Sequence, residues 1–128
     1  MSRNIDVFVG TAENLEDFIR ELESLLNIKL KIAFYGHNIL YEYHNSRIVL
    51  SVGDHDYDND RDMNFEDYQY DIEIRAVNRD TEEERKKWRE DFSYLVFNKL
   101  KEMGRYKLMM VDNLQIKLKE FHPQTSGV

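Results

Sequence analysis

The stretch YDIEIRA, residues 70–76, decides the fold class, because its apolar and charged residues alternate one by one. An extended chain turns successive side chains to opposite faces, which separates two sets here: Tyr70, Ile72, Ile74 and Ala76 on one face, and Asp71, Glu73 and Arg75 on the other. This period of two predicts a β-strand that buries one face against a core.

Six further strands are predicted from similar runs, at residues 5–9, 28–34, 39–43, 47–52, 106–111 and 114–119. In the run 28–34, apolar residues alternate with two lysines, so we expect one buried face there as well. Short polar turns between neighbouring runs indicate hairpins, and hairpins make a sheet mostly antiparallel.

Two helices are predicted from apolar residues at spacings of three and four. The first covers roughly residues 13–26, with Thr11 or Asn14 as its N-cap. The second begins at a capping box, Asp80 with Glu83 or Thr81 with Glu84. Its apolar stripe consists of Trp88, Phe92, Leu95, Val96, Leu100 and Met103, and Gly104 ends it.

The predicted order is therefore β-α-β-β-β-β-α-β-β. We expect an α+β fold, with a mostly antiparallel sheet and both amphipathic helices on one face. The whole of residues 1–122 forms one domain in this interpretation, and residues 123–128 form a flexible C-terminal tail.

The composition excludes several classes of protein. The chain has no cysteine, which rules out disulfides, thiolate catalysis and cysteine-ligated zinc, and which fits a cytoplasmic location. No apolar run approaches the roughly 20 residues that cross a bilayer, and the N-terminus is too polar for a signal peptide. We therefore expect no membrane association.

The net charge of −7 is concentrated in residues 54–71, which we call the acidic segment. These 18 residues hold seven Asp, one Glu and one Arg, whereas the other 110 residues hold 17 acids and 17 bases. A field of this sign repels nucleic acid and attracts basic surfaces, so we expect no direct nucleic-acid binding.

The acidic segment also contains aromatic residues, which favours a binding surface over a merely solvated loop. We predict that its carboxylates attract a basic protein partner and that Tyr57, Phe65 and Tyr68 anchor it. The predicted partner-binding residues are Asp54, Asp56, Tyr57, Asp58, Asp60, Asp62, Phe65, Glu66, Asp67 and Tyr68.

A specific metal site is not predicted. The alternating Asp residues from Asp54 resemble the first half of a calcium loop, but position 6 is Asn59 rather than Gly and position 12 is Phe65 rather than Glu. The flanks read as strands instead of helices, so only weak, non-specific divalent binding is expected. The four histidines, at 37, 44, 55 and 122, are scattered and form no zinc-binding pair.

Catalytic signatures are absent from the sequence. The pattern Asp71-x-Glu73-x-Arg75 resembles the acidic strand of metal-dependent nucleases, but Arg75 stands where a lysine would be needed, and the three side chains form the polar face of a strand. No nucleophile elbow, P-loop or dinucleotide motif occurs. We therefore expect no enzyme activity, no catalytic residue and no cofactor, and keep a divalent-metal enzyme as a third hypothesis.

The chain resembles small immunity proteins of bacterial polymorphic-toxin and contact-dependent growth inhibition systems. Three stretches carry the resemblance: IDVFVGTAENLEDFIRELESLL (5–26), YQYDIEIRAV (68–77) and YKLMMVDNLQIKLKEF (106–121). It implies an intracellular α+β domain that binds and neutralises a toxin, often a nuclease. The alternative hypothesis is a phage or mobile-element protein that mimics DNA and inhibits a host defence protein.

Overall fold

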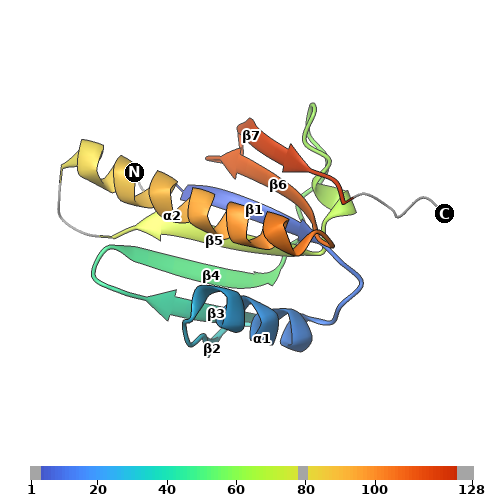
Figure 1. Cartoon of the computed structure of the whole chain (residues 1–128), viewed down its shortest axis with the longest axis horizontal. Coiled ribbons are helices and arrows are strands. Elements are labelled where there is room, and N and C mark those ends of the chain that lie inside the picture. Colours follow the sequence, from blue (N-terminus) through green and yellow to red (C-terminus); the bar gives the residue numbers. More distant parts are fainter. Residues whose placement is uncertain (1–3, 78–80, 124–128) are drawn as a thin grey trace.

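The computed structural model describes residues 4–77 and 81–123, which form one antiparallel sheet of seven strands with two helices (Figure 1). The strands are β1 (Asn4–Gly10), β2 (Lys31–Tyr35), β3 (Asn38–His44), β4 (Ile48–Asp54), β5 (Tyr70–Ala76), β6 (Lys107–Asp112) and β7 (Ile116–Phe121). The helices are α1 (Leu15–Leu26) and α2 (Glu82–Met103), and a single 3-10 turn covers Phe65–Asp67. The α+β class and the predicted order of elements are confirmed.

The strands lie in the order β2-β3-β4-β5-β1-β6-β7, so the N-terminal strand occupies the interior of the sheet. β1 pairs with β5 on one side and with β6 on the other. The hairpins β2-β3-β4 and β6-β7 extend the sheet outward from this centre. Segments far apart in the sequence, residues 4–10 and 70–76, therefore lie side by side.

Both helices cover the same face of the sheet, and the main core lies between them. Phe18 and Leu22 of α1 and Phe97 and Leu100 of α2 are buried there against the apolar face of the strands. The apolar residues of β5 point into this core, as the alternation at 70–76 predicts. Burial of this apolar surface is the main force that holds the sheet and helices together.

The helix ends follow the predicted capping chemistry where the structure describes them. The Asn14 side chain accepts from the Asp17 amide at 2.9 Å, and Thr81 Oγ accepts from the Glu84 amide at 3.2 Å. Gly104 ends α2 with a φ of 74°, the left-handed conformation that glycine adopts readily. The alternative cap, Asp80, lies outside the described residues, as does the predicted tail from residue 124 onward.

Two details of the sequence prediction are wrong. The strand predicted at 28–34 begins only at Lys31, and its side chains Ile32 and Phe34 are 51% and 70% exposed. β2 is an edge strand, and its apolar side chains receive little cover from α1. On α2 the buried face centres on Val96, Phe97 and Leu100, whereas Leu95 is 46% exposed.

The opposite face of the sheet carries a second, smaller core under the acidic segment. Phe8 of β1 and Met109 and Val111 of β6 point to this side, and apolar residues that follow β4 in the chain pack on them. In Figure 1 the segment is the green region that leaves β4 and lies near β6 and β7. The acidic segment is therefore a second layer over part of the sheet rather than a free loop.

Candidate functional site

The acidic segment is held to the sheet by three buried side chains, Met63, Phe65 and Tyr68. The ring of Phe65 lies 4.8 Å from that of Phe8 between centroids, which fixes the segment over β1. Exposing an apolar side chain of this size to water costs about 2 kcal/mol or more, so these contacts keep the segment in one place.

Hydrogen bonds give the segment a defined backbone shape. The Asn59 amide donates to Glu66 at 3.0 Å, and the Glu66 amide donates back to the Asn59 side chain at 2.9 Å. Asp60 and Met63 exchange two backbone hydrogen bonds between them. Both flanks of the segment, β4 and β5, are strands, as predicted.

The predicted acidic residues of the surface are all exposed: Asp54, Asp56, Asp58, Asp60, Asp62, Glu66 and Asp67. Three of them form ion pairs, Asp60 with Arg61, Asp62 with Lys117 and Asp67 with Lys107, at 3.7–3.9 Å. The hydrogen bond from Asn64 and the nearby Lys107 lower the pKa of Asp67. Within residues 4–77 and 81–123, the first three acids of the segment join no ion pair.

The prediction that Phe65 and Tyr68 anchor a partner is wrong for the folded segment. Their side chains are 3% and 2% exposed and pack inside the domain. The aromatic residues point inward because the sheet below presents an apolar patch around Phe8 that needs cover. Tyr57 is 36% exposed, with its ring 5.8 Å from Phe65, so it is the one proposed anchor that keeps an accessible edge.

His55 shapes the start of the segment. Its Nε2 donates to the Tyr68 carbonyl at 2.6 Å, its Nδ1 accepts from the Tyr57 amide at 3.2 Å, and its ring stacks on Tyr57. These contacts join the beginning of the segment to its end. The other three histidines, at 37, 44 and 122, are exposed.

Asp71 does not belong to the acidic surface. It lies on β5 with its Oδ1 out of contact with solvent, next to Asp6 of β1 and Glu73 of β5. Carboxylate oxygens of the three residues lie within 4.8 Å of one another. Of the eight acids in the segment, seven therefore form the exposed field and the eighth takes part in a separate group, which we call the carboxylate cluster (Asp6, Asp71 and Glu73).

The sheet register explains how the carboxylate cluster assembles. Asp6 is paired directly with Glu73 across β1 and β5, and Asp71 is paired with Phe8 one step further along the same face. The polar face predicted for 70–76 is thus confirmed in its orientation, but it is only partly solvated. Asp6 is completely buried, and the sequence analysis missed it, although its place between Ile5 and Val7 in a buried strand is an available signal.

Burial dominates the electrostatics of the cluster. Loss of solvation raises the pKa of Asp6 to about 6, and it raises the pKa of Asp71 well above its usual range, with the neighbouring carboxylates adding to the effect on Asp71. The same carboxylates act on the Tyr57 hydroxyl. Burial is the main cause that raises the pKa of Tyr57 to about 12, and the charges of Asp71, Asp6 and Glu73 add to it. Tyr57 therefore belongs to the surroundings of the cluster.

A polar row continues from the cluster across the sheet. Glu73 pairs with Ser51, Ser51 pairs with Glu42, and Ser51 Oγ donates to Glu42 at 3.3 Å. The Tyr35 hydroxyl donates to the same Glu42 carboxylate at 2.9–3.0 Å. Four adjacent strands thus contribute one line of polar side chains to the face away from the helices.

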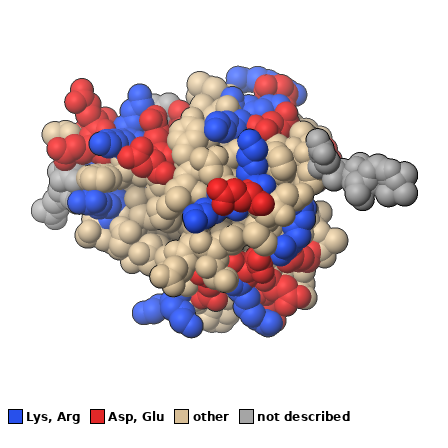
Figure 2. Space-filling model, viewed as in Figure 1, with Lys and Arg blue, Asp and Glu red and all other residues tan. Residues whose placement is uncertain are grey.

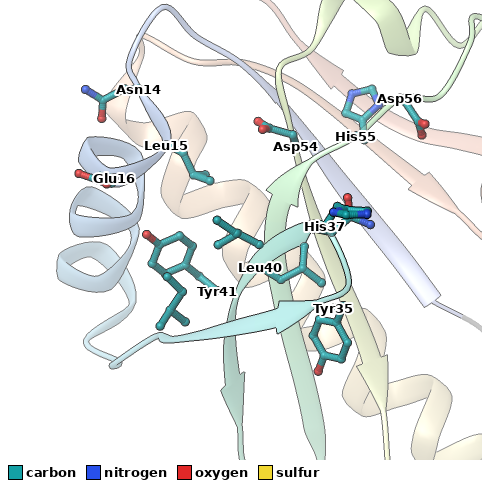
Figure 3. Close-up of a pocket in the computed structure, with 13 residues that line it drawn as sticks. Asn14, Leu15, Glu16, Tyr35, His37, Leu40, Tyr41, Asp54, His55 and Asp56 are labelled. Carbon is teal, nitrogen blue, oxygen red and sulfur yellow. The ribbon is translucent and has the colours of Figure 1, made fainter.

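A partly open pocket of about 860 Å³ lies at one end of the sheet, beside the start of the acidic segment. Figure 3 shows residues of α1 on one side, Asp54, His55 and Asp56 across from them, and side chains of the β2-β3 hairpin between. Three of the exposed apolar residues of the chain, Ile32, Tyr35 and Ile39, line it. The pocket therefore combines carboxylates with accessible apolar surface.

The helix-covered face has a different charge pattern. In Figure 2 acidic and basic side chains are interspersed over this face, with apolar and uncharged surface between them. Exposed ion pairs such as Arg85 with Glu82 contribute to this mixture. The unbalanced negative charge is therefore a property of the acidic segment and not of the whole surface.

Comparison with protein-family models, with curated proteins and with solved structures finds no match for this chain. Neither helix of the described residues is long and apolar enough to cross a membrane. The class of protein that the structure defines is an α+β domain with a seven-stranded antiparallel sheet, helices on one face and an ordered acidic segment on the other.

Proposed function

We propose that this protein is an intracellular immunity or inhibitor protein that neutralises a basic partner, a toxin domain with nuclease activity, by binding it through the acidic segment. The observation that carries the proposal is the division of the segment into two sides. Its side chains Met63, Phe65 and Tyr68 are buried on the sheet, and its seven carboxylates outside the cluster are exposed. The negative field is thus presented in a fixed shape.

A fixed array of carboxylates suits a partner that normally binds phosphate groups. Like charges close together destabilise a fold by repulsion, so their retention on an ordered surface favours a role in recognition. A cationic nucleic-acid site would be attracted at long range, which speeds association, and the carboxylates would occupy the positions of phosphates. Asp54, Asp56 and Asp58, which join no ion pair of the described chain, are the acids best placed for this role.

The pocket beside Asp54 and Asp56 supplies the contact area that the buried Phe65 and Tyr68 cannot give. Its exposed side chains Tyr35 and Ile39 are 53% and 47% accessible. Protein interfaces combine an apolar, often aromatic centre with a polar rim, and this pocket has both within one surface. We therefore place the partner over the pocket and the first half of the acidic segment.

The test uses the triple variant Asp54→Asn, Asp56→Asn and Asp58→Asn as bait in affinity capture from the source cell. A matched control, Glu83→Gln with Asp91→Asn and Glu102→Gln, removes the same charge from exposed positions of α2. We expect the wild type and the control to capture a basic toxin domain, and the triple variant to associate about tenfold more slowly at low salt.

Capture of a host defence protein instead of a toxin would contradict the immunity proposal and support the alternative, a DNA mimic that inhibits such a protein. A partner that binds the triple variant with an unchanged rate and an unchanged salt dependence would show that the acidic segment is not the interface.

A further inference from the structure

The carboxylate cluster has an unusual feature, a fully buried acid without a complete set of partners. Asp6 is 0% exposed, and its Oδ1 accepts from the Asn4 amide group at 2.7 Å. When both acids are ionised, its Oδ2 has no hydrogen-bond donor among the described residues, and neither does the buried Oδ1 of Asp71; a hydrogen bond between the two side chains requires that one of them be protonated. Burying a polar atom without a partner costs roughly 1–3 kcal/mol, and more for a charged group, so native proteins seldom leave one.

The two acids that carry these unpartnered oxygens belong to the cluster. One carboxylate oxygen of each of Asp6, Asp71 and Glu73 lies within 4.8 Å of the other two, so the side chains with unpartnered atoms face other carboxylates. Arg75 offsets the charge of Glu73 from one side, with its Nε 3.4 Å from Glu73 Oε1, whereas Asp6 and Asp71 form no ion pair among the described residues. Negative charges at this spacing repel strongly in a buried site. Either a proton or a cation must lie among them at neutral pH.

The geometry suits a cation. Oxygen ligands of Mg²⁺ or Ca²⁺ lie about 2.0–2.6 Å from the metal, which places ligand atoms on opposite sides of the ion about 4–5 Å apart. The three donors are all carboxylates, with no nitrogen or sulfur atom among them, and this donor set favours Mg²⁺, Ca²⁺ and Mn²⁺ over zinc or copper. Glu73 keeps 35% of its side chain exposed, so water can reach the ion and complete its coordination.

We propose that Asp6, Asp71 and Glu73 form a binding site for one hard divalent cation on the face of the sheet opposite the helices. The site joins β1 to β5, two strands 60 or more residues apart in sequence, at the centre of the sheet. It is separate from the exposed carboxylates of the acidic segment. The proposal of a cation site does not depend on the proposal of a toxin partner.

The experiment titrates the purified full chain with Mn²⁺ at pH 7.5 and measures the free ion by its electron paramagnetic resonance signal. We expect one ion per chain, and Ca²⁺ or Mg²⁺ at millimolar concentration should raise the melting temperature by about 5 °C. Asp71→Asn should weaken Mn²⁺ binding at least tenfold and abolish the rise in melting temperature. The amide has nearly the shape of the carboxylate, so the fold should be retained.

Two further variants keep the test decisive. Glu73→Gln changes a partly exposed ligand without disturbing the core, and it should also weaken binding at least tenfold. The matched control, Asp58→Asn with Asp60→Asn and Asp62→Asn, removes three exposed carboxylates of the acidic segment and should leave the single tight site intact.

The absence of stoichiometric Mn²⁺ binding to the wild type would overturn the proposal and leave a shared proton in the cluster. Binding that survives Asp71→Asn and Glu73→Gln but is lost in the acidic-segment control would also overturn it, because the ions would then be held by the exposed acids.

Discussion

The rings of Phe8 and Phe65 lie 4.8 Å apart between their centroids, one contributed by the central strand β1 and the other by the acidic segment. Phe8 is completely buried and Phe65 is 3% exposed. This contact joins the part of the chain with the largest net negative charge to the middle of its sheet. The order of the acidic segment therefore depends on this apolar contact as well as on its hydrogen bonds and ion pairs.

Phe65→Ala should lower the free energy of unfolding by about 3 kcal/mol, because it leaves a cavity over Phe8 and Met109. Urea denaturation followed by circular dichroism measures the change, and amide exchange should become faster throughout the segment. Asp58→Asn, an exposed change in the same segment, should stay within about 0.5 kcal/mol of the wild type. Equal stability of Phe65→Ala and wild type would mean that the segment is not packed as described.

Gly53→Ala should destabilise the protein by about 1–2 kcal/mol through a steric conflict. A β-carbon at this position would lie 2.5 Å from Cδ2 of Leu40 and 3.2 Å from the Ile39 carbonyl oxygen. Shortening the neighbour by Leu40→Ala should remove much of this cost, so a double-mutant cycle should give a clear coupling energy. Simple additivity of the two changes would contradict the close approach of β3 and β4 at Gly53.

Tyr68→Phe should leave the protein at least as stable at neutral pH, because the Tyr68 hydroxyl is buried and has no hydrogen-bond partner in the described part of the chain. Burial, followed by the charges of Glu120 and Asp67, raises the pKa of Tyr68 to about 12. The unfolded chain releases this proton near pH 10, before the native state does, so wild-type stability should fall between pH 10 and 12.

Tyr68→Phe should remove its share of that alkaline loss, on the order of 1–2 kcal/mol by pH 12. Denaturation curves at pH 9, 10.5 and 12 measure the difference between the two proteins. A difference that does not grow with pH would show that Tyr68 titrates normally in the native state.

Phe34→Lys should change the free energy of unfolding by no more than about 0.5 kcal/mol, because the Phe34 side chain is 70% exposed on the edge strand β2. It should also reduce self-association at high concentration, since an exposed apolar edge favours contact between molecules. Sedimentation velocity over a range of concentrations measures the second effect. A loss of several kcal/mol would mean that Phe34 is covered in the native state.

The order of elements could be predicted because each depends on local spacing. The alternation of Tyr70 to Ala76 and the cap at Thr81 specify their structures within a few neighbouring residues. The burial of a side chain could not be predicted in the same way, because it depends on which other elements cover the strand. Ile32 and Ile72 follow the same alternation, but Ile72 lies in the main core whereas Ile32 lies on the edge strand β2 outside it, so Ile32 is 51% exposed and Ile72 0%.

The candidate sites were harder to predict for a related reason. The acidic segment has no regular period, so its sequence does not indicate which side chains face the sheet, and Phe65 and Tyr68 turned inward to cover Phe8. The carboxylate cluster arises only when β1 pairs with β5 in one register, which brings Asp6 opposite Glu73. Asp6 between Ile5 and Val7 is a local signal of a buried acid, but the sequence around it does not show that Glu73 lies opposite.

The acidic segment connects β4 and β5, which are direct neighbours in the sheet and which a tight turn could join. It is thus an insertion whose buried and exposed positions obey different constraints. Met63, Phe65 and Tyr68 must stay apolar or aromatic to cover the sheet, whereas the outward-facing acids are free of the core. During evolution this division would let recognition diverge by surface substitutions alone, while the underlying scaffold stays unchanged.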